Sequence, residues 1–529
     1  MAETPVCIVG AGPTGLLLGI ELARRGVPFR LIDRYPQPLG WDRATVIKPR
    51  SLELFDSLDL ADAFLARGRI VRQATFFLKG AEVATIGFDG LDSRYQYVLS
   101  LPESETERML TEKLHELGGS VERDLELTGL AQTEEGIRAR LRRVSSGEES
   151  EYEASWLVGT DGLHSAVREA VADPFEGHDN PLLWAVVDGR LNGWKHDPDA
   201  IAVQLERPAV NPIPLGDGRW RIYFRPDAAG AGALDKVAEG LTVLSPGAGL
   251  GEHDTPRFFH THSRVAKNYR VGRVLLAGDA AHVCNPIQGH GMNVGMQDAH
   301  NLGWKLALVV QGEASTDLLD SYEPERRPIA QTIVASGDEA EKRFGGKDSD
   351  IADAVKRITN VAGHHSAVVA ESEIAHCYRQ SPIVLDAGPE VHEGEEITPV
   401  GCRVGDVEAL AHRDGISRLH ELLRPARHAL FILPCGEGGD QADCLNQAAI
   451  VAARFRPQLD AHVAVLAAFG GGALPQGLIH DPAGDLHRRL AGDRPCVCLT
   501  RPDGHLAFRS SGLSTDRLET YLSGILMAG

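Results

Sequence analysis

Short apolar runs alternate with helical repeats from the start of the chain. Residues 5–9, PVCIV, form an apolar run typical of a buried strand, and residues 14–26, TGLLLGIELARRG, carry a helical repeat that ends in two arginines and a glycine. Residues 27–33, VPFRLID, return to a strand pattern and end on an acid. This order predicts a β-α-β unit at the N-terminus.

The alternation continues to about residue 380. A loop and then a helix are expected over 42–66, further helices over 104–118 and 297–312, and mainly helix over 322–380. The segments VERDLELTGLAQ and IRARLRRVS predict antiparallel strands, and EASWLVGTDG predicts another strand of the first sheet. Between roughly 178 and 265, strand-like pieces rich in Trp, Tyr and Phe are separated by Pro and Gly turns. They predict an antiparallel sheet inserted into the first fold.

The pattern changes after a Gly-, Glu- and Pro-rich stretch at 386–401, which is the best linker candidate. Beyond it, HALFILP, HVAVLAAF, PCVCLTRPDG and HLAFRS alternate with helical pieces. This is the pattern of a separate small α/β domain.

Composition narrows the class of protein. The 529 residues suggest two to four domains, and 54 Lys+Arg against 74 Asp+Glu give a net charge of -20, which argues against nucleic-acid or membrane-surface partners. There is no 18-residue apolar run and no basic N-terminal region, so we expect neither a membrane span nor a signal peptide. The eight cysteines include no C-x-x-C pair, which favours reduced thiols in a cytoplasmic protein without a metal site.

The first chemical motif is G-x-G-x-x-G at Gly10, Gly12 and Gly15. These glycines permit a tight turn, a close backbone approach to a pyrophosphate, and close packing of helix on strand. The helix that follows offers N–H groups at its N-terminus. Asp33 ends the second strand, where its carboxylate can accept hydrogen bonds from a ribose diol. An acid at this position favours FAD or NAD over NADP.

A second segment far downstream carries complementary chemistry. Gly278-Asp279 ends the strand VLLA, and the loop 285–291 leads into a helix near Met292 and Asn293. Asp279 can accept a hydrogen bond from a sugar-like hydroxyl, and the first amides of the helix can face the carbonyl of an isoalloxazine ring, where reduced flavin develops negative charge. One FAD extended across the sheet explains both segments.

Together these motifs resemble those of the single-component, FAD-dependent aromatic hydroxylases. The similar segments are GAGPTG, then Asp161-Gly162 with Ser165 and Arg168, then AGDAAH and QDAHNLGWKLA. YRVGRVLLAGDAAH, SYEPERRP and RPDGHLAFR resemble the phenol hydroxylase and polyketide hydroxylase branch, so the resemblance covers most of the chain.

The resemblance implies an α/β fold and a mechanism. The fold is a Rossmann-like FAD-binding domain of the glutathione-reductase type with an inserted antiparallel substrate domain and a C-terminal thioredoxin-like domain. NADPH or NADH reduces FAD in a transient encounter, and O₂ then forms a flavin C4a-hydroperoxide that hydroxylates a phenolic or polycyclic aromatic substrate. That species must be shielded from water, and a base or cation near the phenol should assist.

The expected domain boundaries follow the same resemblance. Residues 1–177 form the first part of the FAD-binding domain, with 75–100 contributing to the substrate domain, and 178–266 form the substrate sheet. Residues 267–385 supply the second part and a helical segment, 386–401 the linker, and 402–529 the thioredoxin-like domain. Without C-x-x-C, the last domain should lack dithiol chemistry. It is assigned an interaction or dimer-supporting role, with a homodimer as the candidate assembly.

The resemblance also implies a set of FAD-binding positions. Arg43 is expected to reach the phosphates or the ribityl chain, and Asp161 and Arg168 to organise the pyrophosphate and the approach of NADPH. The full set is Gly10, Gly12, Pro13, Thr14, Gly15, Asp33, Arg34, Arg43, Glu103, Leu127, Asp161, Arg168, Gly278, Asp279, Pro286, Gly289, Gly291, Met292 and Asn293.

Two positions depart from the family pattern. Glu103 stands where the family usually has Gln, and a carboxylate near flavin oxygens would repel them unless it is protonated or paired, with Arg108 as the candidate partner. The loop 288–291 reads QGHG where the family usually reads GGQG, which puts bulk beside the reactive edge of the flavin.

Four residues are candidates on the substrate side. Arg221 and Tyr223 lie two positions apart on a predicted strand and therefore on one face, where they could bind a phenolate or relay a proton. A solvent-facing arginine and a packing tyrosine explain them equally well. His262 is a similar candidate, with a hydrogen-bonded structural histidine as the alternative. Lys48 lies in the loop where relatives place substrate-facing groups.

Two other functions stay open at this stage. The first is a flavin monooxygenase that carries out Baeyer–Villiger or epoxide chemistry on a polyketide. The second is a flavin-binding protein that has lost turnover, which Glu103 and the altered loop would explain.

Overall fold

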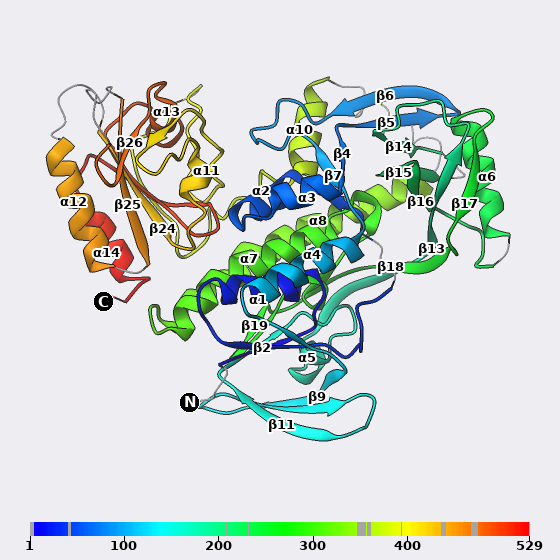
Figure 1. Cartoon of the computed structure of the whole chain (residues 1–529), viewed down its shortest axis with the longest axis horizontal. Helices are drawn as coiled ribbons and strands as arrows, with labels where there is room; N and C mark the ends of the chain where they lie inside the picture. Colours follow the sequence, from blue (N-terminus) through cyan, green and yellow to red (C-terminus); the bar gives the residue numbers. More distant parts are fainter. Residues whose placement is uncertain are drawn as a thin grey trace.

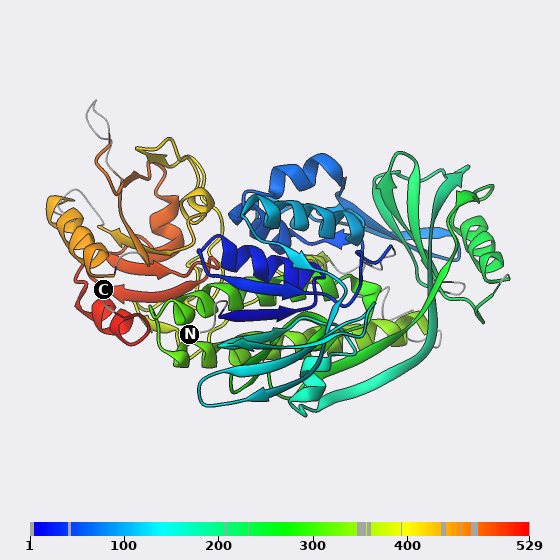
Figure 2. The same cartoon turned by 60° about the horizontal axis from the view of Figure 1, so that its bottom comes forward.

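The computed structural model describes residues 5–40, 44–206, 209–230, 232–345, 356, 361–392, 394–434, 441–455, 458–466 and 474–527. A central sheet with its helices lies between an inserted sheet with α6 (Ala233–Leu244) at one end of the molecule and the C-terminal unit at the other (Figures 1 and 2). No helix among the described residues is long and apolar enough to span a membrane.

The central sheet has six strands in the order β19-β20-β12-β1-β2-β8. β1 (Val6–Val9) pairs in parallel with β2 (Phe29–Ile32) on one side and with β12 (Trp156–Gly159) on the other, and β12 pairs in parallel with β20 (Val274–Leu276). β8 (Val121–Glu122) and β19 (Arg270–Val271) form the edges. The carboxyl ends of the parallel strands therefore meet at one edge, where such sheets place their ligands.

Helices cover this sheet as the apolar patterns predict. α1 (Pro13–Ala23) packs on α7 (Gly291–Val310) and on α4 (Glu103–Glu116). The expected helix after residue 42 is instead two helices, α2 (Pro49–Ser57) and α3 (Ala61–Arg67), because Asp59 adopts a left-handed backbone with φ 57°. Aspartate tolerates this conformation better than most residues, which is why the break is cheap at this position.

Further elements lie along the rim of the central sheet. The antiparallel strands β9 (Leu125–Gln132) and β10 (Ile137–Arg143) are confirmed, and β11 (Glu149–Ala154) joins them. The other rim elements are α5 (Ala166–Ala170), the 3₁₀ turns η1 (Gly278–Ala280), η2 (Pro286–Gln288) and η3 (Thr316–Ser321), α8 (Tyr322–Gly345) and α10 (Val361–Ser372).

The inserted region is built around the long strand β13 (Phe175–Asn192), which pairs antiparallel with β16 (Arg219–Phe224) and β18 (Arg257–Ala266). β15 (Val210–Gly216), β17 (Gly249–His253) and β21 (His282–Val283) complete this sheet. β5 (Gln73–Leu78) and β6 (Ala81–Gly87) form a separate sheet with β14 (Ala200–Gln204), and β3 (Val46–Ile47), β7 (Val98–Ser100) and β4 (Arg69–Val71) form another. Residues from the first hundred positions thus share sheets with the insertion.

The C-terminal unit is a seven-stranded mixed sheet in the order β22-β28-β27-β24-β25-β26-β23. Its strands are β22 (Leu385–Ala387), β23 (Ala411–His412), β24 (His428–Leu433), β25 (Leu459–Val465), β26 (Leu478–His480), β27 (Cys496–Thr500) and β28 (Leu506–Ser511). Its helices are α11 (Leu419–Leu422), α12 (Gln441–Arg454), α13 (Asp485–Ala491) and α14 (Asp516–Ser523). Because β22 pairs with β28, the stretch predicted as a linker at 386–401 begins inside this sheet, and the prediction needs that correction.

A disulfide also overturns the expectation that all cysteines are reduced. Cys377 and Cys402 are bonded, and the two residues form an antiparallel bridge between the segment after α10 and the C-terminal unit. The cysteines lie 25 positions apart in a chain without C-x-x-C, so spacing alone did not reveal the pair. Cys7, Cys284, Cys496 and Cys498 carry free thiols.

A buried ionic cluster joins the C-terminal unit to the helices of the central domain. The carboxylate of Glu325, on α8, accepts hydrogen bonds from Lys305 Nζ at 2.6 Å and from Arg501 Nη1 at 2.6 Å. All three side chains are almost completely buried. Burial alone would raise the pKa of Glu325, but Arg501 and Lys305 outweigh it and lower the pKa to about 2. A cluster of this kind depends on every partner being present.

Replacing Glu325 with glutamine tests this joint. We expect E325Q to lower the free energy of unfolding by about 3 kcal/mol near neutral pH, because two cations lose a buried counter-charge. The folded pKa of Glu325 lies below its ordinary value of 4.5, so its contribution is complete above that value and is lost as the pH falls towards 2. Urea unfolding at neutral and acidic pH measures both effects.

The matched control is E239Q, which breaks the exposed pair of Glu239 with Lys236 on α6 and should leave the urea midpoint close to that of the parent. Equal urea midpoints for E325Q and E239Q at neutral pH would show that the Glu325 cluster does not hold the two units together.

Candidate active site

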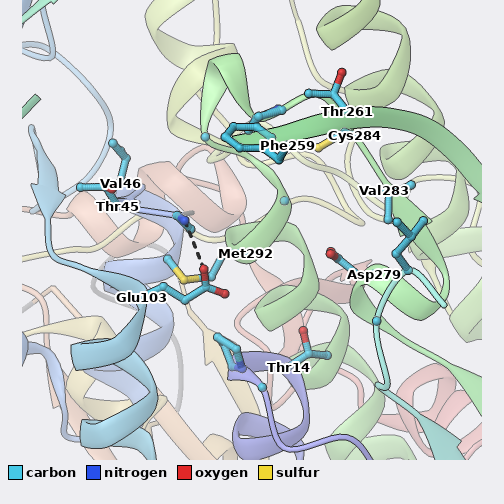
Figure 3. A pocket seen from close by; sticks show the side chains of 18 of the residues that line it. Thr14, Thr45, Val46, Glu103, Phe259, Thr261, Asp279, Val283, Cys284 and Met292 are labelled. Atoms are coloured by element: carbon cyan, nitrogen blue, oxygen red, sulfur yellow. Dashed lines mark hydrogen bonds between the residues drawn. The ribbon is translucent and has the colours of Figure 1, made fainter. Parts of the chain in front are cut away.

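A cavity of about 990 Å³ follows the carboxyl edge of the central sheet and continues into the inserted region. Its volume is at the upper end of the range for ligand pockets. At one end it is lined by the turn after β1, and at the other by side chains of β5, β6, β14, β16 and β18. Figure 3 shows Asp279 and Met292 pointing into this space, between Thr14 at one end and Phe259 at the other.

The three glycines of the first motif have different tasks. A Cβ on Gly10, where φ is +104°, would lie 2.4 Å from the carbonyl oxygen of Thr160, and a Cβ on Gly15 would lie 1.9 Å from that of Gly10. A Cβ on Gly12 would meet nothing nearer than Glu107 Oε1 at 3.8 Å. Gly10 and Gly15 therefore allow the backbone to pack, whereas Gly12 keeps the cavity side of the turn open.

The start of α1 faces the same end of the cavity. Pro13 is the first residue of the helix, and Gly12 caps it without any side chain, so the amides of the first turn are available to a ligand. Pro13 and Thr14 line the cavity. This is the arrangement that binds the pyrophosphate of a dinucleotide.

Asp33 lies next to this turn and is held by backbone amides. Its Oδ2 accepts from the N–H of Ala11 at 2.7 Å, and its Oδ1 accepts from that of Tyr35 at 2.9 Å. The carboxylate still lines the cavity, together with Arg34 and Leu127. All three residues therefore lie at the end of the cavity formed by the turn after β1, and their role in binding FAD stays a prediction.

The late segment forms the opposite wall. Gly278 has φ +60°, and a Cβ there would lie 2.5 Å from Thr14 Oγ1, so this glycine lets the two segments approach each other. Asp279 is exposed to the cavity, which Pro286, Gly289, Gly291 and Met292 also line. The two wall segments belong to one cavity, and the residues present fit an extended dinucleotide with a flavin ring.

Three further predicted positions are Arg43, Asp161 and Arg168. Arg43 lies outside the described residues. The guanidinium of Arg168 is buried and donates to the carbonyl oxygens of Ala280 at 2.8 Å and of Leu163 at 2.7 Å, so it fixes the backbone of the late turn rather than meeting a ligand. Asp161 does line the cavity, and it accepts from Ser165 Oγ at 2.5 Å and from the N–H of Val167 at 3.1 Å.

Asn293, like Arg168, contacts the backbone of the cavity-forming segments and does not line the cavity. Its Oδ1 accepts from the N–H of Lys48 at 2.9 Å, and its Nδ2 donates to the carbonyl oxygens of Val46 and Gly289, each at 2.8 Å. The side chain is fully buried. It ties β3 to the loop before α7.

Of the four substrate-side candidates, Tyr223, His262 and Lys48 line the cavity, and Arg221 does not. Arg221 is buried and donates to both carboxylate oxygens of Asp188, at 2.8 and 2.7 Å, and to Thr45 Oγ1 at 2.9 Å. The prediction that it binds a phenolate is therefore wrong, because its donors serve the protein and it does not line the cavity. Tyr223 does line the cavity, with its hydroxyl 3.3 Å from Thr45 Oγ1. His262 lines it as well and pairs with Asp179 at 2.8 Å.

The far end of the cavity is an apolar chamber. The sequence predicted an aromatic-rich inserted sheet but not which of its side chains line the chamber. Aromatic side chains from the inserted sheets and aliphatic side chains from the neighbouring strands make up most of its wall. They are Phe76, Ile86, Phe88, Trp184, Ile201, Val203, Ile213, Tyr223 and Phe259.

Glu371 is a cavity-lining residue that the sequence did not reveal. It comes from the last turn of α10, lines the cavity, and pairs with Lys48 Nζ at 3.0 Å. The two residues are 323 positions apart, and nothing in the local pattern around Glu371 marks it as a site residue.

The two departures from the family pattern have local explanations. Glu103 Oε2 accepts from the N–H of Ala44 at 3.1 Å (Figure 3). Arg108, the expected partner of Glu103, instead donates to Glu105 at 3.0 Å and pairs with Glu112. In the altered loop, Gln288 lines the cavity, but the His290 side chain is buried and faces away from it.

The described residues contain no group of three or more His, Cys, Asp and Glu side chains that is arranged to hold a metal ion.

The glycine geometry yields a sharp mutational contrast. We expect G15A to prevent correct folding, because its Cβ would overlap a backbone carbonyl that cannot move away. We expect G12A to fold and to lose FAD affinity by about tenfold or more, since its Cβ would occupy only ligand space. Thermal melting and titration of the apoprotein with FAD measure the two effects. Normal FAD binding by G12A would place the pyrophosphate elsewhere.

Comparison with known proteins extends over nearly the whole chain. Residues 3–336 match the family described as FAD binding domain. The chain is 31% identical to the pentachlorophenol 4-monooxygenase of Sphingobium chlorophenolicum, covering 96% of this chain and 94% of that protein. It is 32% identical to the 6-methylpretetramide 4-monooxygenase of Streptomyces rimosus, covering 98% and 93%. The solved structure of an anhydrotetracycline hydroxylase from Streptomyces rimosus is similar, with a TM-score of 0.73, 28% identity and 98% of both chains covered.

Proposed function

The chain belongs to the FAD binding domain family, and from this premise we propose that it is an FAD-dependent aromatic monooxygenase that consumes NAD(P)H and O₂. The observation that carries the proposal is the continuous cavity, which joins a dinucleotide-binding turn to an apolar chamber. A relative that covers almost the whole chain is named for pentachlorophenol, and this supports an aromatic substrate here as well.

When bound, FAD supplies the redox chemistry: it takes a hydride from NAD(P)H and delivers one oxygen atom of O₂ to the ring. The residues of this chain bind and shield it. The backbone at Gly12 and the first turn of α1 would hold the pyrophosphate, Asp33 a ribose, and Asp279 the ribityl chain. The backbone from Gly289 to Met292 would face the ring. The inserted sheets exclude water from the reacting end.

The chamber wall indicates an uncharged substrate with more than one ring. Its side chains are mostly aromatic and aliphatic, and two of its polar groups already have acidic partners: Lys48 pairs with Glu371, and His262 pairs with Asp179. Lys48, a described cation of the chamber wall, already pairs with Glu371, so a substrate carboxylate would have to compete for it or be buried without a counter-charge, which costs several kcal/mol. We therefore propose a neutral phenol, naphthol or larger fused-ring substrate.

Two finer assignments of the fold belong to this proposal. We propose that the central parallel sheet is Rossmann-like and that the C-terminal sheet is thioredoxin-like, on the basis of their strand orders. The C-terminal unit has no C-x-x-C, and its ionic contacts with α2 and α8 suit a brace within the chain. The need for NAD(P)H suits a cytoplasmic location.

The first test of the function is spectroscopic and kinetic. We expect the purified protein to show flavin absorption and to release FAD on denaturation, because the cavity has both binding segments. We expect 1-naphthol to accelerate NADPH or NADH oxidation and to yield a hydroxylated product that chromatography and mass spectrometry identify. A colourless protein that takes up no added FAD would sink the proposal, and stimulated oxidation that yields only H₂O₂ would refute hydroxylation of this probe class.

The second test concerns substrate charge. We compare 1-naphthol with 1-hydroxy-2-naphthoic acid, which adds only a carboxylate to the same ring system. The acid should have a kcat/KM at least about tenfold lower, because its charge would be buried beside side chains that already have partners. A preference for the acid would contradict the neutral-substrate proposal while leaving the monooxygenase assignment intact.

A further inference from the structure

An ion pair lies in the wall of the apolar chamber on the side of α10. Lys48, the residue that caps the start of α2, places Nζ 3.0 Å from Oε2 of Glu371. Both residues line the cavity, and Lys48 is 4% exposed. Lys48 is buried and Glu371 is half-buried, so the lysine has given up most of its hydration to a single carboxylate at the surface of a ligand cavity, which makes a role in the chemistry worth testing.

Behind this pair lies a second layer of titratable groups. His290 Nε2 is 3.7 Å from Glu371 Oε2, and His290 Nδ1 is 2.6 Å from Glu373 Oε1. Gln288 Nε2 donates to Glu371 Oε1 at 2.6 Å, and Gln297 donates to the other oxygen of Glu373. His290 and Glu373 are buried. The layer therefore continues from the cavity surface into the protein as a series of polar and ionisable groups.

We propose that Lys48 and Glu371 are a catalytic pair that ionises the phenolic hydroxyl of the substrate, with His290 and Glu373 as positioning residues behind them. The inference rests on the proposed function. In the step, the phenol O–H bond breaks and an O–H bond forms on a Glu371 carboxylate oxygen. The electron pair stays on the phenolate oxygen, which takes the place of Glu371 beside Lys48. No oxidant or further reactant is needed.

The geometry makes the exchange favourable. In the free enzyme, burial alone would raise the pKa of Glu371, but Lys48 and His290 outweigh it and keep the pKa below its ordinary value. When a phenolic oxygen moves beside Lys48, Glu371 loses its nearest cation and the effect of burial remains. The proton affinity of Glu371 then rises while that of the phenol oxygen falls. An ionised phenol is the more electron-rich acceptor for oxygen transfer.

The test uses 4-nitrophenol, because its phenolate is coloured and its neutral form is not. It is titrated into the FAD-loaded enzyme at a pH below its own pKa, and difference spectra and calorimetry in two buffers report ionisation and proton release. We expect the parent protein to bind it as the phenolate without releasing a proton to solvent, because Glu371 keeps the proton. Binding as neutral phenol, or with one proton released per site, would overturn the proposal.

Two variants test the separate roles of Glu371 and Lys48. E371Q should either release about one proton on binding the phenolate or bind the neutral phenol, and K48M should lose at least about tenfold of the bound phenolate signal. E239Q, in the exposed pair on α6, should behave as the parent. If the pair served only to fasten α10, E371Q and the parent would show the same signal and proton count.

The outcome separates the inference from the proposed function. If 1-naphthol is hydroxylated by the parent but 4-nitrophenol binds as the neutral phenol, the pair is not the ionising group and the monooxygenase assignment stands. If neither phenol perturbs the flavin spectrum, both fail together. A loss of product per NADPH of about tenfold in E371Q, with FAD content unchanged, supports the inference.

Discussion

The carboxylate of Asp298, on the buried helix α7, is the contact on which the site depends. It accepts from the N–H of Gly278 at 3.1 Å, pairs with His282 Nε2 at 2.6 Å, and accepts from Arg326 Nε at 2.7 Å. Burial alone would raise the pKa of Asp298, but His282 and Arg326 outweigh it and lower the pKa. One charge thus fixes the turn after β20, the strand β21 and the helix α8 to α7. Asp279 faces the cavity because its neighbour Gly278 is held in this way.

The sequence predicted what short-range chemistry determines. Gly10, Gly12, Gly15 and Asp33 lie close together along the chain, and their roles follow from local backbone requirements. Most strands and helices followed the apolar pattern for the same reason. The exceptions include Asp59, where one left-handed residue divides the expected helix, and β22, where the predicted linker begins within a strand.

What could not be predicted depends on partners distant in the sequence. Arg221 has the chemistry of a phenolate binder, and only the register of β13 with β16, which sets Asp188 opposite it, shows that its donors are used. Arg168 was placed near the cofactor, but its guanidinium goes to the Ala280 carbonyl, 112 positions away. Glu371 could not be found from the sequence, because only its contact with Lys48 marks it, and Lys48 lies 323 positions earlier in the chain.

The C-terminal unit also helps to hold a helix that supports the cavity wall, α2. Three residues on one face of α2 meet it: Arg50 donates to the carbonyl of Asp503 at 2.8 Å, Glu53 pairs with Arg403 at 3.0 Å, and Asp56 pairs with Arg424 at 2.7 Å. Lys48 caps this helix, so the C-terminal unit holds the element that positions Lys48. The altered loop belongs to the same arrangement. A glycine at position 288, as in the family pattern, would remove the amide that donates to Glu371 Oε1 at 2.6 Å, and His290 is the imidazole partner of the fully buried carboxylate of Glu373. The loop 288–291 and the end of α10 therefore form one unit, and neither side can change without the other.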